Sequence, residues 1–167
     1  MSTSWQEPLW GQLGAAIDML ERAIVACPDA CWRDHTRQPE YWYVAYHTLF
    51  FLDYYLAGSP EAYRPPEPFT LDELDPAGLL PDRVYEKDEL LRFLAHGRAR
   101  CRERIRALTD AVTGQRCAFV RLDLSELELM IQNLRHVQHH AAQLNLLLRQ
   151  HGVEPPRWVS RTAHELD

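Results

Sequence analysis

The stretch SELELMIQNLRHVQHHAAQLNLLLRQHG, from Ser125 to Gly152, has the pattern of one long amphipathic helix. Ser125 stands three residues before Glu128, which is the spacing of a capping box, and a glycine favours the end of a helix. Apolar residues recur at steps of three and four, so they line one face from Ser125 to about His151. That stripe, which predicts packing against other helices, consists of Met130, Leu134, Val137, Ala141, Leu144 and Leu148.

Three further stretches are also predicted to be helices. They cover residues 5–26, 39–58 and 85–112. Ser4 and Glu7 give the first of them a second capping-box spacing. A strand pattern appears at most briefly, near residues 118–122, and no internal repeat is evident. We therefore expect an all-α fold, an up-down-down-up four-helix bundle that forms a single domain over residues 1–167.

The second predicted helix and the segment after it contrast strongly. Residues 39–58 carry aromatic side chains on nearly every helical face, which predicts neighbours on several sides. Residues 59–84 hold six of the eleven prolines and show no helical period. Unstructured connections of this length are uncommon in a compact domain, and they often cover a functional site. The surplus apolar surface on residues 39–58 also favours a homodimer.

The composition indicates a globular protein without a nucleic-acid or membrane partner. The chain has 167 residues, with 24 Asp plus Glu against 18 Lys plus Arg, and an acidic balance disfavours phosphate binding. The longest apolar stretch, residues 44–56, is interrupted by polar residues and is too short to span a bilayer. No basic and apolar leader opens the sequence, and the four cysteines are too scattered for a disulfide framework. We expect a cytoplasmic protein with reduced thiols.

Three of the eight histidines fall within one short segment of the last predicted helix. His136 and His140 are four residues apart, so they share a helical face and can chelate one ion, whereas His139 points towards solvent. Such a pair is weak evidence alone, because surface helices carry it by chance. His47 lies in the aromatic second helix, where an unpaired imidazole would be costly. It is either a hydrogen-bonded core histidine or a third metal ligand.

Two segments resemble signatures of the DinB/YfiT-like superfamily of four-helix bundles. Residues 133–150, NLRHVQHHAAQLNLLLRQ, are similar to its last helix, and residues 46–56, YHTLFFLDYYL, to its second helix. The helix pattern and the long second connection also match, so the resemblance covers nearly the whole chain. It implies that His47, His136 and His140 bind a divalent metal.

Three protein ligands would leave a coordination position open for water or substrate, which is typical of a reactive site. Imidazole ligands suit several transition metals, of which we expect Zn or Ni. Three polar side chains next to the ligands either orient them or are ordinary interface residues, namely Tyr43, Asn133 and Gln143. Many superfamily members have His-Arg-Gly-Gln where this chain has HAAQ at residues 140–143, so no role tied to that Arg or Gly is expected here.

Two classes of function follow from these observations. The resemblance implies relatives that are thiol-dependent transferases or isomerases, which use bacillithiol, mycothiol or glutathione, and a hydrolase would use the same site. An open metal position would bind the thiol sulfur and lower its pKa. The alternative is a non-catalytic metal-binding or interaction bundle, with its ion sealed by a fourth ligand such as Asp53, Asp34 or His35. The sequence identifies neither a catalytic residue nor the substrate.

Arg98 stands on the apolar stripe of residues 85–112. It is either an anion-binding group for a substrate carboxylate or a side chain that pairs with an acidic neighbour, and we favour the second. The nearby arginines alternate around the helix with Glu103 between them, which is typical of a solvated face.

Overall fold

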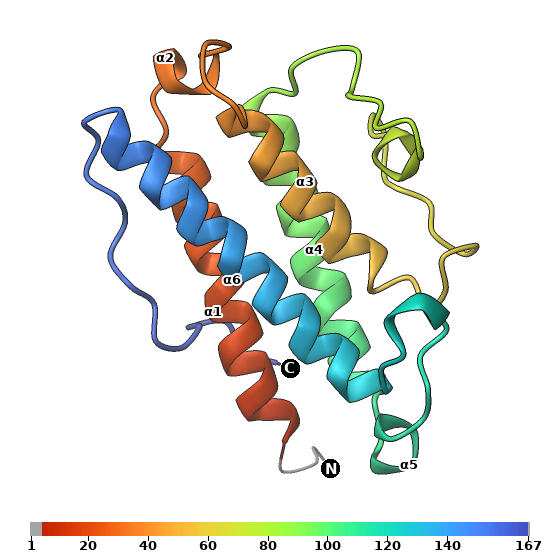
Figure 1. Ribbon diagram of the computed structural model, residues 1–167. Helices are drawn as coiled ribbons and strands as arrows, with labels where there is room; N and C mark the ends of the chain where they lie inside the picture. The colour runs from red at the N-terminus through yellow and green to blue at the C-terminus, as the bar shows by residue number, and fades with distance from the viewer. Residues whose placement is uncertain (1–4, 167) are drawn as a thin grey trace.

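The computed structural model describes residues 5–166, which fold around four long helices (Figure 1). The long helices are α1 (Gln6–Ala26), α3 (Tyr41–Tyr54), α4 (Lys87–Ala107) and α6 (Glu126–Gln150). The connections contain the short helices α2 (Asp29–Trp32) and α5 (Asp110–Thr113) and the 3₁₀ turns η1 (Asp72–Leu74) and η2 (Val120–Leu122). In Figure 1, α1 and α6 run in one direction and α3 and α4 in the other. The all-α, up-down-down-up bundle is confirmed.

Each long helix packs against two others. Both α1 and α3 lie against α4 and α6, so α1 and α3 occupy opposite corners of the bundle. Burial of a Leu, Ile or Phe side chain contributes about 1.5–3 kcal/mol, which makes this shared apolar interior the main source of stability. Fully buried side chains from all four helices meet there, among them Trp10, Leu49, Leu94 and Leu144.

The ends of α6 follow the local signals in the sequence. The hydroxyl of Ser125 accepts a hydrogen bond from the backbone N–H of Glu128, and the carboxylate of Glu128 accepts one from the backbone N–H of Ser125. This pair is the predicted capping box. At the other end, Gly152 has a positive φ of 74°, a conformation that glycine adopts without strain. Ser4, expected to cap the first helix, lies outside the described residues.

The third predicted helix is shorter than its periodicity indicates. α4 ends at Ala107, and buried Leu108 takes an extended conformation before α5 begins. The side-chain amide of Gln6 donates to the carbonyl oxygens of Ile105 and Leu108, at 2.9 and 2.8 Å. A helix leaves its last carbonyl groups without intrahelical partners, so Gln6 stabilises the break from a distant part of the chain.

The prediction of a short strand near residues 118–122 is wrong. Residues Val120–Leu122 form η2, and the described part of the chain contains no strand apart from an isolated bridge between Arg116 and Ser125. The chain reverses direction between these two residues, with Asp123 in the left-handed region at φ 51°, so no length remains for a paired strand.

The apolar surplus of α3 is covered within the same chain. The long connection that follows α3 packs Tyr63 against Phe50, with ring centroids 5.2 Å apart. It also stacks Phe69 on Phe93 of α4 at 4.3 Å. Because these contacts bury the extra aromatic face, α3 supplies no further argument for a homodimer, which stays a prediction.

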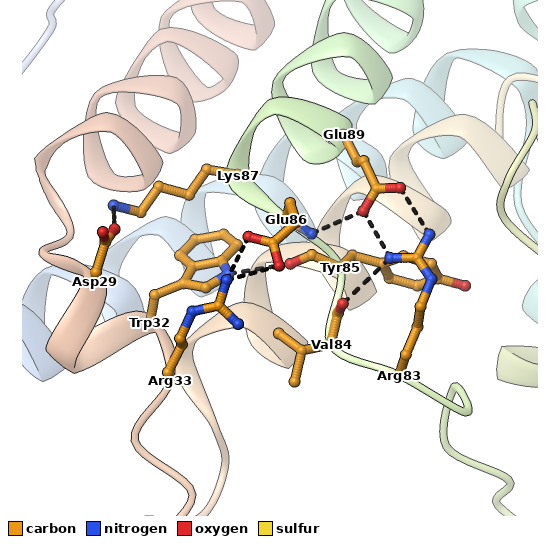
Figure 2. Close-up of polar contacts among 9 residues, drawn as sticks. All are labelled: Asp29, Trp32, Arg33, Arg83, Val84, Tyr85, Glu86, Lys87 and Glu89. Atoms are coloured by element: carbon orange, nitrogen blue, oxygen red, sulfur yellow. Dashed lines mark hydrogen bonds and ion pairs between the residues drawn. The ribbon is translucent and has the colours of Figure 1, made fainter.

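The connection is also fixed where it enters α4 (Figure 2). Arg83 pairs with Glu89 at 2.7 Å, and the indole N–H of Trp32 donates to the carbonyl oxygen of Tyr85 at 3.0 Å. The Glu86 side chain caps the first turn of α4 in a capping box with Glu89. These contacts hold the end of the connection against both α2 and α4.

None of the helices within residues 5–166 is long and apolar enough to cross a membrane. The four cysteines, Cys27, Cys31, Cys101 and Cys117, are buried free thiols, in agreement with the expectation that they are reduced. Burial raises the pKa of the Cys101 thiol well above its usual range, so this side chain behaves as an apolar core residue.

Candidate metal centre

Three histidines from two helices meet where α3 packs against α6. His47 comes from α3, and His136 and His140 stand one turn apart on α6. One ligand atom from each residue lies within 4.8 Å of the others. The ring centroids are 5.5 Å apart for His47 and His136 and 4.9 Å apart for His47 and His140. The group is partly buried and could hold a metal ion.

The chemistry of the α6 histidines fits a metal ligand set. Nδ1 of His136 is buried and has no hydrogen-bond partner among the described residues. An unpaired buried imidazole nitrogen is costly, and a bound cation would satisfy it. Burial, together with the neighbouring His140 and His47, lowers the pKa of His136 to about 3, and burial also lowers the pKa of His140. Both rings are therefore neutral near pH 7, which is the form that binds metals.

A carboxylate from the long connection holds His47. Oε1 of Glu73, in η1, lies 2.5 Å from Nδ1 of His47. The hydroxyl of Tyr43, one helical turn earlier on α3, donates to the same oxygen at 3.1 Å. The Glu73 side chain is only 4% exposed, so the carboxylate is buried against α3. A histidine that donates its Nδ1–H to a carboxylate presents Nε2 to a metal.

Sequence reasoning missed Glu73. The residue lies 26 positions after His47 in a segment without helical periodicity, and no spacing rule connects the two. The available signal was indirect, because a long connection was expected to cover a site and an acidic residue within it is a natural partner for a histidine.

The three side chains expected next to the ligands have different roles. Oε1 of Gln143 lies 2.7 Å from Nδ1 of His140, so of the two alternatives Gln143 takes the orienting role towards His140. Tyr43 does not contact a nitrogen of the three histidines by a hydrogen bond; its hydroxyl donates to Glu73, which contacts His47. Asn133 instead donates from its side-chain amide to the carbonyl oxygen of Leu52 at 3.0 Å and joins α6 to α3. His139 is exposed, as predicted.

The candidates for a fourth ligand are engaged in other contacts. Asp53 is buried and pairs with Arg100 at 2.5 Å. Asp34 pairs with His151 at 3.0 Å, near the end of α6. His35 pairs with Glu40 at 2.6 Å. None of these three residues belongs to the group that could hold an ion.

Arg98 likewise has a structural role. Its guanidinium pairs with Asp18 at 3.0 Å and with Glu21 at 2.7 Å, and both acids belong to α1. These contacts join α4 to α1 and confirm the expectation that Arg98 pairs with acidic neighbours.

Aromatic rings pack beside the histidines, and one of them, Tyr55, also lines an open cavity. The ring of Phe51 lies 4.9 Å from that of His47, and the ring of Tyr55 lies 6.3 Å from that of His136. Beyond Tyr55 is a cavity of about 460 Å³, whose lining includes Tyr54, Glu61, Phe119 and Arg121. None of the three histidines lines this cavity, but His136 lines a second open pocket, of about 470 Å³, together with Gln132 and Arg135.

A helical bundle with three histidines gathered between two of its helices is a candidate metalloprotein. The family model of the DinB superfamily matches residues 12–144, a span that includes His47, His136 and His140, and the chain belongs to this superfamily. No curated protein matches the chain. Membership of the DinB superfamily agrees with the helical fold. A fold does not determine a reaction, which depends on the residues of the site.

Proposed function

We propose that this protein is a divalent-metal-dependent enzyme that acts on small molecules, with His47, His136 and His140 as its metal ligands. The observation that carries the proposal is the convergence of one ligand atom from each histidine within 4.8 Å. Three protein ligands with no fourth are the pattern of a reactive site. Imidazole ligands suit Zn and Ni, which are the ions we favour.

A divalent ion with an open coordination position lowers the pKa of a thiol or water that binds there. The protein supplies the geometry. Glu73 and Gln143 accept hydrogen bonds from Nδ1 of His47 and His140, which orients both rings. Phe51 packs against His47 and His136 and shields one side of the group from water. The open pocket that His136 lines gives a substrate a path to this ring.

Among the reactions open to such a site we favour transfer to or from a low-molecular-weight thiol. All four cysteines are buried, so the nucleophilic thiol would come from a small molecule such as glutathione, bacillithiol or mycothiol. Metal-assisted hydrolysis would use the same residues. A purely structural ion would need a fourth protein ligand, and Asp53, Asp34 and His35 are each paired elsewhere.

The proposal is tested with the Co²⁺-loaded protein, because Co²⁺ reports its coordination by visible absorption. We expect that titration with glutathione, bacillithiol or mycothiol changes the d–d bands and produces a sulfur-to-cobalt charge-transfer band. The variant Cys101→Ser, altered at a buried thiol, serves as a control and should give the same band. Spectra that stay unchanged at saturating concentrations of all three thiols would contradict thiol chemistry and favour a non-catalytic metal-binding bundle.

A further inference from the structure

Part of the long connection is held by few apolar contacts. We call residues 70–84, between the buried rings of Phe69 and Tyr85, the arch. Four of its side chains are exposed leucines, with exposed fractions between 36% and 61%, namely Leu71, Leu74, Leu79 and Leu80. Segments that bury little apolar surface have low local stability. The position of the arch therefore depends on the polar contacts it makes with the bundle.

The two ends of the arch are fixed by contacts outside the metal centre. At one end, Phe69 stacks on Phe93 with ring centroids 4.3 Å apart. At the other end, Arg83 pairs with Glu89 at 2.7 Å, as Figure 2 shows. Between these ends, the buried carboxylate of Glu73 reaches α3, where it contacts His47 and Tyr43.

The contact between Glu73 and His47 is of a strong type. Hydrogen bonds to a carboxylate are roughly twice as strong as those between neutral groups. The carboxylate is 4% exposed, so water competes weakly for it, and Tyr43 supplies a second donor. One side chain thus joins the arch to a residue of the three-histidine group.

We propose that Glu73 is a positioning residue for the metal centre and that it couples metal binding to the order of the arch. This inference rests on the proposed function only in taking His47 as a ligand. By accepting the Nδ1–H of His47, Glu73 leaves Nε2 as the ring nitrogen that can bind an ion shared with His136 and His140. Coupling between two equilibria is reciprocal. If the ordered arch raises the affinity for the metal, the bound metal stabilises the ordered arch by the same free energy.

The first test measures the Zn²⁺ affinity of the full chain by competition with a chromophoric chelator. Loss of an outer partner of a metal ligand weakens metal binding by about 10–100-fold, and we expect this loss in Glu73→Ala. Glu73→Gln keeps an acceptor oxygen without the charge, so its affinity should fall between those of the wild type and Glu73→Ala. The control Glu67→Gln makes the same change at an exposed position of the same connection and should bind as the wild type does.

The second test follows amide hydrogen exchange of the arch with and without Zn²⁺. In the wild type and in Glu67→Gln, we expect Zn²⁺ to slow exchange in residues 70–84. In Glu73→Ala, the arch should exchange faster and respond little to Zn²⁺, while α1 and α4 keep wild-type exchange and show that the variant is folded. A purely structural role for Glu73 would alter exchange without changing the Zn²⁺ affinity.

The outcomes separate this inference from the proposed function. If the wild type binds Zn²⁺ and Glu73→Ala binds it equally well, the positioning role is wrong and the metal centre remains. If Zn²⁺ leaves exchange of the wild-type arch unchanged, the coupling is wrong. If the wild type binds no divalent ion, the proposed function fails and this inference fails with it.

Discussion

The two helices of the metal centre hold their histidines in different ways. On α6, His136, His140 and the orienting Gln143 all lie within eight residues of one helix, and the contact of Gln143 with His140 is between neutral groups. On α3, His47 is held by the carboxylate of Glu73, 26 residues away in the chain. The α6 side therefore depends on helix geometry alone, whereas the α3 side depends on the path of the connection and on a charge. Changes to the connection should disturb only the α3 side.

The largest expected effect comes from removing a ligand on the α6 side. His136→Ala leaves two imidazoles, and we expect the affinity for Zn²⁺ to fall by more than about 100-fold, since loss of an outer partner alone costs about 10–100-fold. Arg135→Ala is the control, because Arg135 is exposed on the same helix. Competition titration gives both affinities. An equal loss of Zn²⁺ affinity in the two variants would show that His136 is not a metal ligand.

Acid should destabilise the metal-free protein through His136 on α6. Burial lowers the pKa of His136 from 6.5 to about 3, so the folded protein keeps the ring neutral while the unfolded chain protonates it. Unfolding then takes up a proton, and the free energy of unfolding falls as the pH drops from about 6.5 towards 3. We expect a loss of about 1–3 kcal/mol between pH 7 and pH 4. Chemical denaturation of the metal-free protein at several pH values measures it.

The same His136→Ala variant sharpens this result. Without the buried imidazole, the free energy of unfolding of the metal-free protein should depend less steeply on pH, whereas Arg135→Ala should keep the wild-type slope. A slope that is identical in all three proteins would assign the acid sensitivity to other groups.

The smallest expected effect comes from the neutral contact on α6. In Gln143→Ala, His140 loses the acceptor for its Nδ1–H, but the helix still holds the ring close to His136. We expect Zn²⁺ affinity to fall by less than about 10-fold, because a neutral hydrogen bond is about half as strong as a charge-assisted one. The competition titration compares this variant directly with Glu73→Ala. A larger loss in Gln143→Ala would reverse the proposed difference between the two sides.

The same difference explains how much of the molecule could be predicted from its sequence. Local signals were sufficient on α6, where the capping box of Ser125 and the four-residue spacing of the two histidines both appear in the structure. His47 could be assigned only with the family resemblance, because its partners on α6 are distant in sequence. The pairing of Glu73 with His47 depends on tertiary structure, so no local pattern encodes it.

The end of α4 shows the same limit outside the site. The apolar periodicity continues past Ala107, but the helix ends there. The side-chain amide of Gln6, which lies 99 residues before Ile105 in the chain, donates a hydrogen bond to the Ile105 carbonyl oxygen. Local patterns therefore predicted the helices and the spacing of ligands within one helix. Contacts made by the connections needed the three-dimensional structure.

The most direct test of the metal centre is elemental analysis of the untagged wild-type protein and of His47→Ala, with helix content followed by circular dichroism. We predict about one equivalent of a divalent metal, Zn or Ni, in the wild type. We predict its loss in His47→Ala without loss of helix, because the ring is partly exposed and α3 is packed by other residues. A wild-type protein that takes up no divalent ion after reconstitution, or an equal metal content in the two proteins, would contradict the account.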